Sequence, residues 1–165
     1  MLGNMDFTDR REAGARLADP VRIAVHHAAI ESSLTVVAIA PGGVPVARPI
    51  LAALSQDAVG TVFTQVSYLD GEVAGAPAAP GLLPSSAAAT NLVIVVADGV
   101  ETGRAALSVS AALAQAGWER RWLAVPVCPR QTRPALDRHY ERVIALVTPL
   151  ARRSLRWHYA DREDA

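Results

Sequence analysis

The sequence contains no lysine, and all sixteen of its basic residues are arginine. A Walker A loop needs a lysine on the β- and γ-phosphates, so this absence excludes the common class of P-loop nucleoside triphosphatases. It also excludes covalent chemistry through a lysine Schiff base. Cysteine is nearly absent as well, because the lone Cys128 cannot form an internal disulfide. A single free cysteine fits a reducing cytoplasm.

Excess charge and long apolar runs are also missing. Sixteen acidic residues balance the sixteen arginines, so nothing favours a nucleic acid or an anionic membrane as a partner. No apolar run approaches the roughly 20 residues that cross a bilayer. Residues 1–14 lack an apolar signal core, so we expect a cytoplasmic protein that is not exported. We expect residues 1–165 to form one domain, since this length buries a substantial core.

Segments typical of strands alternate with segments typical of helices along the whole chain. Short runs of apolar, often β-branched residues predict strands at 34–40, 60–69, 92–97, 121–127 and 142–149. The intervening segments predict helices at 7–18, 21–29, 44–54, 103–116 and 133–141. This alternation predicts a single-domain α/β fold with a mostly parallel sheet flanked by helices.

Three local signals refine these elements. Asp9 and Glu12 have the spacing of a capping box, and Asp19-Pro20 is expected to interrupt the helix that they begin. Gly117 is placed to end the helix over 103–116. The segment 70–90 is rich in Gly, Ala, Pro and Ser, which predicts a loop.

The stretch NLVIVVADGVETGRAA, residues 91–106, carries the strongest functional signal. An apolar strand runs into Asp98 and Gly99, then into a Thr-Gly-Arg turn that opens a helix. Ligands of open parallel sheets bind beyond the carboxyl ends of the strands. The N–H groups of the following helix attract anions, Thr102 adds a hydroxyl, and Arg104 adds a cation for phosphate. On the residues alone, an ordinary strand-to-helix turn remains an alternative.

These residues resemble the phosphoribosyl pyrophosphate loop of type I phosphoribosyltransferases. In that family a strand is followed by two acidic residues, a spacer and Thr-Gly-x-Thr, and residues 97–105 are the counterpart here. The resemblance extends to a subgroup of bacterial homologues with three further stretches. Those stretches are F-x-D-R-x-x-A-G at residues 7–14, RGGVPVA in part at 42–47, and RWYADF loosely at 156–161.

The resemblance implies a role for each position of the loop. Asp98 would accept hydrogen bonds from ribose hydroxyls, and Glu101 stands where purine-salvage members keep a catalytic acidic residue near the base. The 5′-phosphate would be bound by Gly99, Val100, Thr102, Gly103, Arg104 and Ala105. Pro41, Gly42 and Gly43 would form the loop beside the pyrophosphate. Magnesium would arrive on the phosphoribosyl pyrophosphate, with no direct protein ligand, and would help the leaving group depart.

Several residues depart from the family pattern, and because of them two functions are predicted below. Ala97 replaces the first acidic residue, Ala105 the last threonine, and Pro41 the arginine before the two glycines. The missing lysine and the short segment between Tyr68 and Asn91 remove further contacts expected around the pyrophosphate and the base. Losing one strong donor at a transition state costs roughly 2.7–4 kcal/mol in comparable enzymes.

Two hypotheses follow. The first is a phosphoribosyltransferase that transfers a phosphoribosyl group to or from a base. The alternative is a catalytically weak or inactive module that senses a sugar phosphate or nucleotide. Either protein would bind a small molecule, with a homodimer as one way to cover an exposed site. For Glu101, favourable helix-dipole chemistry is an alternative to catalysis. Trp157 and Tyr159 would either stack on a base or anchor the chain end.

Overall fold

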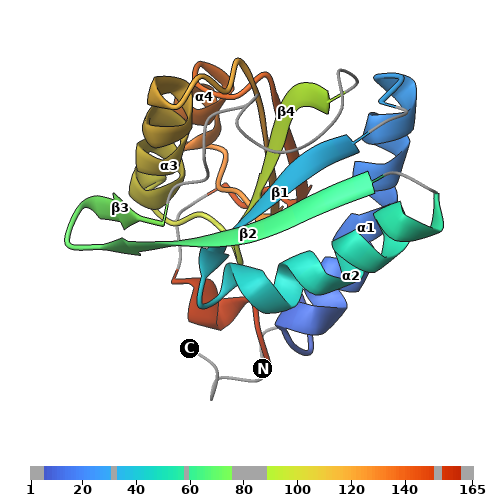
Figure 1. The fold of residues 1–165 in the computed structure, drawn as a ribbon. Helices are drawn as coiled ribbons and strands as arrows, with labels where there is room; N and C mark the ends of the chain where they lie inside the picture. Colours follow the sequence, from blue (N-terminus) through green and yellow to red (C-terminus); the bar gives the residue numbers. More distant parts are fainter. Residues whose placement is uncertain (1–5, 31–32, 58–59, 76–88, 151–153, 161–165) are drawn as a thin grey trace.

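The computed structural model describes residues 6–30, 33–57, 60–75, 89–150 and 154–160, which form one sheet between two layers of helices (Figure 1). Asp161, the last residue of the C-terminal match, lies outside these ranges. The elements in chain order are α1 (Arg10–His27), β1 (Ser33–Ala40), α2 (Gly43–Gln56), β2 (Gly60–Leu69), β3 (Glu72–Ala74), β4 (Ala89–Val96), α3 (Arg104–Gln115), β5 (Arg120–Val127), α4 (Arg133–Asp137), β6 (Arg142–Val147) and the 3₁₀ turn η1 (Leu155–Trp157). In the described part of the chain, no helix has the length and apolarity to span a membrane.

The six strands lie in the order β3-β2-β1-β4-β5-β6. Five of them are parallel, and only the short β3 runs antiparallel, beside β2. β4 pairs with β1 on one side and β5 on the other, so the predicted strand before Asp98 is central. The predicted α/β architecture with a mostly parallel sheet is confirmed.

The central strands are buried on both faces, which explains their nearly continuous apolar sequence. Along β4, Ile94 and Val96 face α1 and α2, whereas Val93 and Val95 face α3. Figure 1 shows α1 and α2 on one side of the sheet and α3 and α4 on the other. Trp118, Trp122 and Cys128 are packing residues of this core, since all three side chains are buried.

The expected interruption at Asp19-Pro20 is wrong, because α1 continues unbroken from Arg10 to His27. A proline inside a helix forfeits one backbone hydrogen bond. Here the residues on both sides of it share one buried face, whose members are Ala13, Gly14, Leu17, Ala18, Val21, Ala24 and Val25. The packing of this face outweighs the local loss at Pro20. The capping prediction is confirmed for Asp9, whose carboxylate accepts from the Glu12 N–H at 2.7 Å. The Glu12 carboxylate accepts from the Thr8 N–H, where a capping box would use the Asp9 N–H.

The segment predicted as a loop over 70–90 contains regular structure at both ends. β2 and β3 form a hairpin around Asp70 and Gly71, whose φ angles are 52° and 87°. Two successive positive φ angles are the signature of a type I′ hairpin turn, which favours an Asp-Gly pair. β4 begins earlier than expected, at Ala89, and residues 76–88 lie outside the described part.

Candidate functional site

The turn between β4 and α3 lies at the carboxyl end of the parallel sheet. Two glycines shape it: Gly99 has a φ of 149° and Gly103 a φ of 85°, both unfavourable for residues with a Cβ atom. At Gly103 the space is closed as well, because a Cβ atom there would lie 2.9 Å from the Thr132 methyl group. The chain therefore turns sharply from β4 into α3, and no side chain of the turn caps the N-terminus of the helix.

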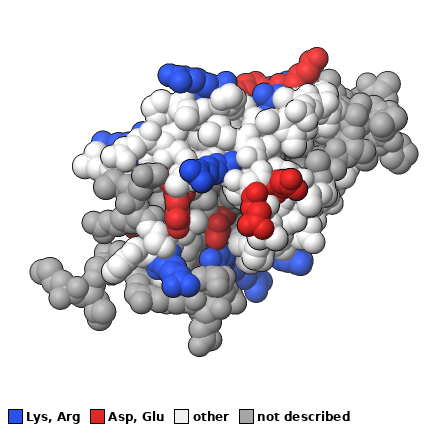
Figure 2. Space-filling model, turned by 90° about the vertical axis from the view of Figure 1, so that its left-hand side faces the viewer, with Lys and Arg blue, Asp and Glu red and all other residues white. Residues whose placement is uncertain are grey.

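A cavity of about 610 Å³ opens above this turn. Its lining comes from the end of β1, the β2–β3 hairpin, the β4–α3 turn and η1, namely Ile39, Tyr68, Asp70, Gly71, Ala97, Asp98, Gly99, Val100, Glu101, Thr102, Gly103, Arg104, Ala105, Ala106 and Leu155. Acidic and basic side chains gather near the centre of the face shown in Figure 2. The residues predicted for phosphate and ribose contacts, together with Glu101, thus border one cavity, whereas Trp157 and Tyr159 do not line it.

The first turn of α3 presents backbone donors to this cavity. Gly103 precedes the helix without a side-chain cap, and the first intrahelical bond runs from the Leu107 N–H to the Gly103 carbonyl at 2.9 Å. The N–H groups of Ala105 and Ala106 precede that bond, so they have no partner within the helix. The Arg104 N–H makes a long contact of 3.4 Å with the Thr102 hydroxyl. This arrangement suits an anion.

Val100 differs from its neighbours in the predicted phosphate loop. Its side chain is buried, and its N–H donates to the Val127 carbonyl at 2.9 Å. The residue therefore holds the loop against the end of β5, and its backbone donor is already occupied.

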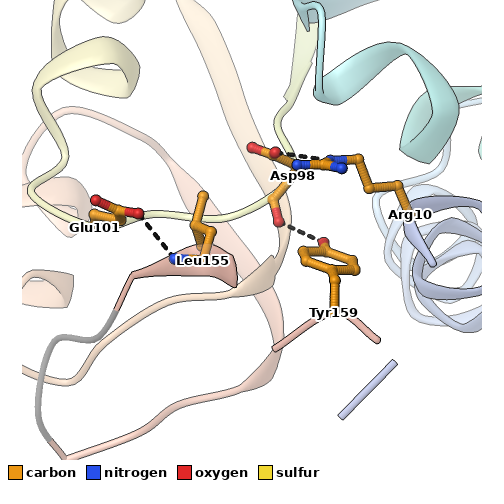
Figure 3. Close-up of polar contacts among 5 residues, drawn as sticks. All are labelled: Arg10, Asp98, Glu101, Leu155 and Tyr159. Carbon is orange, nitrogen blue, oxygen red and sulfur yellow. Dashed lines mark hydrogen bonds and ion pairs between the residues drawn. The ribbon is translucent and has the colours of Figure 1, made fainter. Parts of the chain in front are cut away.

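Asp98 forms a partly buried ion pair with Arg10, which lies 88 positions earlier in the sequence. Its Oδ2 atom accepts from Arg10 Nε at 2.9 Å, and the two side chains are 21% and 10% exposed, respectively (Figure 3). Gly42 lies against the same oxygen, because a Cβ atom at residue 42 would stand 2.3 Å from it. The structure thus brings Asp98 together with the predicted pyrophosphate loop, although residues 41–43 do not line the cavity itself.

Glu101 is exposed at the cavity, with its carboxylate accepting a hydrogen bond from the Leu155 N–H at 2.8 Å. Figure 3 shows this contact reaching from the β4–α3 turn to η1. The Leu155 side chain also presses on the turn, because a Cβ atom at Gly99 would lie 2.4 Å from Leu155 Cδ2. One carboxylate oxygen of Glu101 therefore orders the C-terminal segment.

The two C-terminal aromatic residues behave differently. Tyr159 is buried beside Phe7 and donates its hydroxyl hydrogen to the Asp98 carbonyl. Burial, together with the nearby Asp98 charge, raises the pKa of Tyr159 well above its usual value, so the hydroxyl stays protonated. Trp157 is 61% exposed and lies outside the cavity lining. Tyr159 thus anchors the chain end on the site, which was one of the two roles considered for it.

The acidic residues around the cavity do not form a metal-binding cluster. Within the described ranges, no group of three or more His, Cys, Asp or Glu side chains has the geometry to hold a metal ion. Magnesium in phosphate sites commonly takes one or two carboxylates and completes its shell with substrate phosphates and water. Asp98 and Glu101 in the cavity lining are carboxylates of the kind that such an ion takes.

Three residues at the site have roles that the sequence patterns do not predict. Arg10 belongs to the N-terminal motif, and its ion pair joins residues 88 positions apart. Leu155 and Asp70 belong to no binding motif, yet both line the cavity. Their contributions depend on tertiary contacts that no local pattern encodes.

Comparisons with known proteins agree with this geometry at the level of the fold. No family model and no curated protein matches the sequence. Among solved structures, TT1426 from Thermus thermophilus is similar over 96% of this chain and 92% of its own, with 21% identity and a TM-score of 0.68. The hypoxanthine phosphoribosyltransferase of Staphylococcus aureus is similar over 85% of this chain and 75% of its own, with 17% identity and a TM-score of 0.59. The hypoxanthine phosphoribosyltransferase of Trypanosoma cruzi is similar over 86% of this chain and 78% of its own, with 11% identity and a TM-score of 0.57.

At these sequence identities, the structural similarity shows a shared fold and does not identify a ligand. The predicted resemblance is confirmed in that sense.

Proposed function

Because the chain has the fold of the type I phosphoribosyltransferases, we propose that it binds a phosphoribosyl compound, either phosphoribosyl pyrophosphate or a nucleotide. The observation that supports this most is the uncapped first turn of α3, which opens into the cavity of about 610 Å³ beside Asp98. A 5′-phosphate would accept from the N–H groups of Ala105 and Ala106 and from the Thr102 hydroxyl. Arg104 would contribute charge at the same end.

The ribose would lie towards Asp98. The Oδ2 atom of Asp98 already accepts a hydrogen bond from Arg10, so we assign the Oδ1 atom of Asp98 to the ribose hydroxyls. A carboxylate oxygen accepting from two adjacent hydroxyls fixes the sugar ring relative to the phosphate. When bound on the pyrophosphate, magnesium would stabilise the charge of the leaving group. A cytoplasmic location and a homodimer stay predictions.

In the finer form of the proposal, the protein transfers the phosphoribosyl group to or from a base. Glu101 lines the cavity, and its second carboxylate oxygen would accept or deliver a proton at the base. The second candidate is a module that binds the same ligand without turnover. It is favoured by the hydrogen bond from the Leu155 N–H, which already occupies one oxygen of Glu101.

Isothermal titration with ribose 5-phosphate and with phosphoribosyl pyrophosphate tests the binding proposal. We expect saturable binding of both, and a ligand at 100 times its dissociation constant adds about 2.7 kcal/mol to the free energy of unfolding. Thr102→Val removes the hydroxyl and weakens binding, whereas Thr61→Val makes the same change at the distant start of β2 and leaves binding intact. Absence of binding at millimolar ligand contradicts the proposal.

A separate experiment distinguishes transfer from sensing. Pyrophosphate release is followed with phosphoribosyl pyrophosphate, magnesium and a panel of purine and pyrimidine bases. If Glu101 handles a proton, Glu101→Gln lowers turnover by roughly 10²–10⁴-fold and leaves ligand affinity nearly unchanged. Binding without release for any base supports the sensing module.

A further inference from the structure

Arg10 is a nearly buried cation that the proposed function has not used as a ligand contact. It is the first residue of α1, its side chain is 10% exposed, and its guanidinium carbon lies 5.1 Å from the centre of the Tyr159 ring. A charge in such a place is costly unless its donors are satisfied. The ion pair with Asp98 uses only one of the hydrogen-bond donors of the guanidinium.

The guanidinium of Arg10 retains unused donors. An arginine carries five N–H donors in a planar fork. Among the described residues, the only hydrogen bond of Arg10 runs from Nε to Asp98 Oδ2, at 2.9 Å. The four N–H groups on Nη1 and Nη2 therefore have no partner there. A fork with one edge fixed by a carboxylate is preorganised to bind a second anion with its other edge.

The N-terminus of α2 lies beside this fork. α1 and α2 pack closely, since a Cβ atom at Gly14 would lie 2.3 Å from the Val46 carbonyl oxygen. One turn earlier on each helix, Arg10 and Gly42 both contact Asp98 Oδ2. α2 is 14 residues long and, like α3, has no side chain capping its first turn. In the first turn of α2 the Val44 N–H donates to the Pro41 carbonyl at 3.3 Å and Pro45 has no N–H, so Gly43 supplies the backbone donor. This donor, a positive helix end and the Arg10 fork thus meet at one place.

We propose that Arg10 binds the diphosphate group of the ligand at the N-terminus of α2 and supplies there the cation that no lysine provides. This inference rests on the proposed function, since it assigns the second phosphate-bearing end of the same ligand. Asp98 then serves two partners, with Oδ2 orienting Arg10 and Oδ1 facing the ribose. The Asp98 charge, which would otherwise repel the diphosphate, is shielded by the guanidinium between them.

Three ligands separate this role from a purely structural one. Phosphoribosyl pyrophosphate carries both ends, ribose 5-phosphate lacks the diphosphate, and inorganic pyrophosphate lacks the sugar. Each is titrated calorimetrically, with magnesium present, into the wild type, Arg10→Gln and Arg10→Lys. Arg11→Gln is the matched control, because it makes the same change at the adjacent, exposed position of α1. Thermal unfolding checks that each variant is folded, and Arg10→Lys retains the charge if Arg10→Gln does not fold.

We expect Arg10→Gln to weaken phosphoribosyl pyrophosphate and inorganic pyrophosphate at least 10-fold, as charged hydrogen bonds do, and to change ribose 5-phosphate less than twofold. Arg10→Lys gives an intermediate loss, and Arg11→Gln gives none. Equal losses for both sugar phosphates, or no loss, overturn the inference and make Arg10 a support for Asp98 alone. Arg10-dependent binding of pyrophosphate without any sugar phosphate binding sustains the inference and refutes the proposed function. Binding of none of the three refutes both.

Discussion

Gly42 and Asp98 lie in such close contact that a single methyl group does not fit between them. A Cβ atom at residue 42 would stand 2.3 Å from Asp98 Oδ2 and 2.6 Å from its carboxyl carbon. Gly42 has a φ of −65°, so an alanine meets no backbone strain at this position. The requirement for glycine therefore comes from the carboxylate.

Gly42→Ala is expected to displace the Asp98 carboxylate and break its ion pair with Arg10. We expect affinity for ribose 5-phosphate to fall roughly 10-fold or more, because the displaced Asp98 carboxylate no longer reaches the ribose hydroxyls. Titration of the variant measures this. Gly71→Asn is the comparison at another glycine of the cavity lining, since nothing lies within 4 Å of a Cβ atom there and asparagine tolerates the positive φ. Wild-type affinity in Gly42→Ala would show that the carboxylate position is unimportant for binding.

Asp98→Asn tests the ribose contact directly. The amide keeps the size of the side chain and one acceptor oxygen but loses the charge, so we expect about a 10-fold loss of sugar phosphate affinity. Asp70→Asn makes the same chemical change at the hairpin that also lines the cavity. Equal losses in both variants would point to a general charge effect in place of a specific contact.

Tyr159→Phe removes one buried hydrogen bond and leaves the ring in place. Because the Asp98 carbonyl then loses its partner, we expect a destabilisation of about 1 kcal/mol and a melting temperature lower by roughly 2–4 °C. Tyr140→Phe is a comparison at another buried hydroxyl, which donates to the Ala106 carbonyl at 2.6 Å. We expect similar thermal shifts in differential scanning calorimetry, with sugar phosphate affinity lowered more in Tyr159→Phe. An unchanged melting temperature would mean that the C-terminal segment is not anchored through this contact.

The ion pair between Arg120 and Glu141 predicts a pH dependence of stability away from the site. A hydrogen bond from Arg120 holds the pKa of Glu141 below its ordinary value of 4.5. A lowered pKa in the folded state stabilises the protein above pH 4.5, and this contribution disappears as the pH falls through the folded-state pKa. Both side chains are more than a third exposed, so the contribution is about 0.2–1 kcal/mol.

Urea unfolding at pH 7 and pH 3 measures that contribution. Glu141→Gln is expected to be less stable than the wild type at pH 7 and nearly equal to it at pH 3. A difference of the same size at both values would assign the effect to packing.

The local sequence predicted the sheet and the turn between β4 and α3 because both depend on short-range patterns. The run from Leu92 to Val96 is apolar because both faces of β4 are covered, and the turn after it needs glycine at two positions with positive φ. The break expected at Pro20 failed because a buried helix face, formed with distant elements, outweighed one lost hydrogen bond. The hairpin at Asp70 and Gly71 had a recognisable Asp-Gly turn signal, but its short second strand was hidden in a loop-like composition.

The surroundings of the site were less predictable. Arg10 reaches Asp98, and Leu155 reaches Glu101, across 88 and 54 positions of sequence. No periodicity or motif spacing encodes such pairs, because they are created by the packing of α1 and η1 around the sheet. The roles predicted for individual loop residues stay predictions until ligands are tested.

The parallel bridge between Phe7 and Tyr159 fastens the two end segments to each other beneath the β4–α3 turn. The Ala160 N–H donates to the Phe7 carbonyl at 2.9 Å, and the Phe7 N–H donates to the His158 carbonyl at 3.0 Å. A ligand that immobilises Asp98 would therefore slow the opening of the C-terminal segment, since Tyr159 donates to the Asp98 carbonyl. Amide hydrogen exchange at residues 7, 158 and 160 would then report occupancy of the cavity without a label in the site itself.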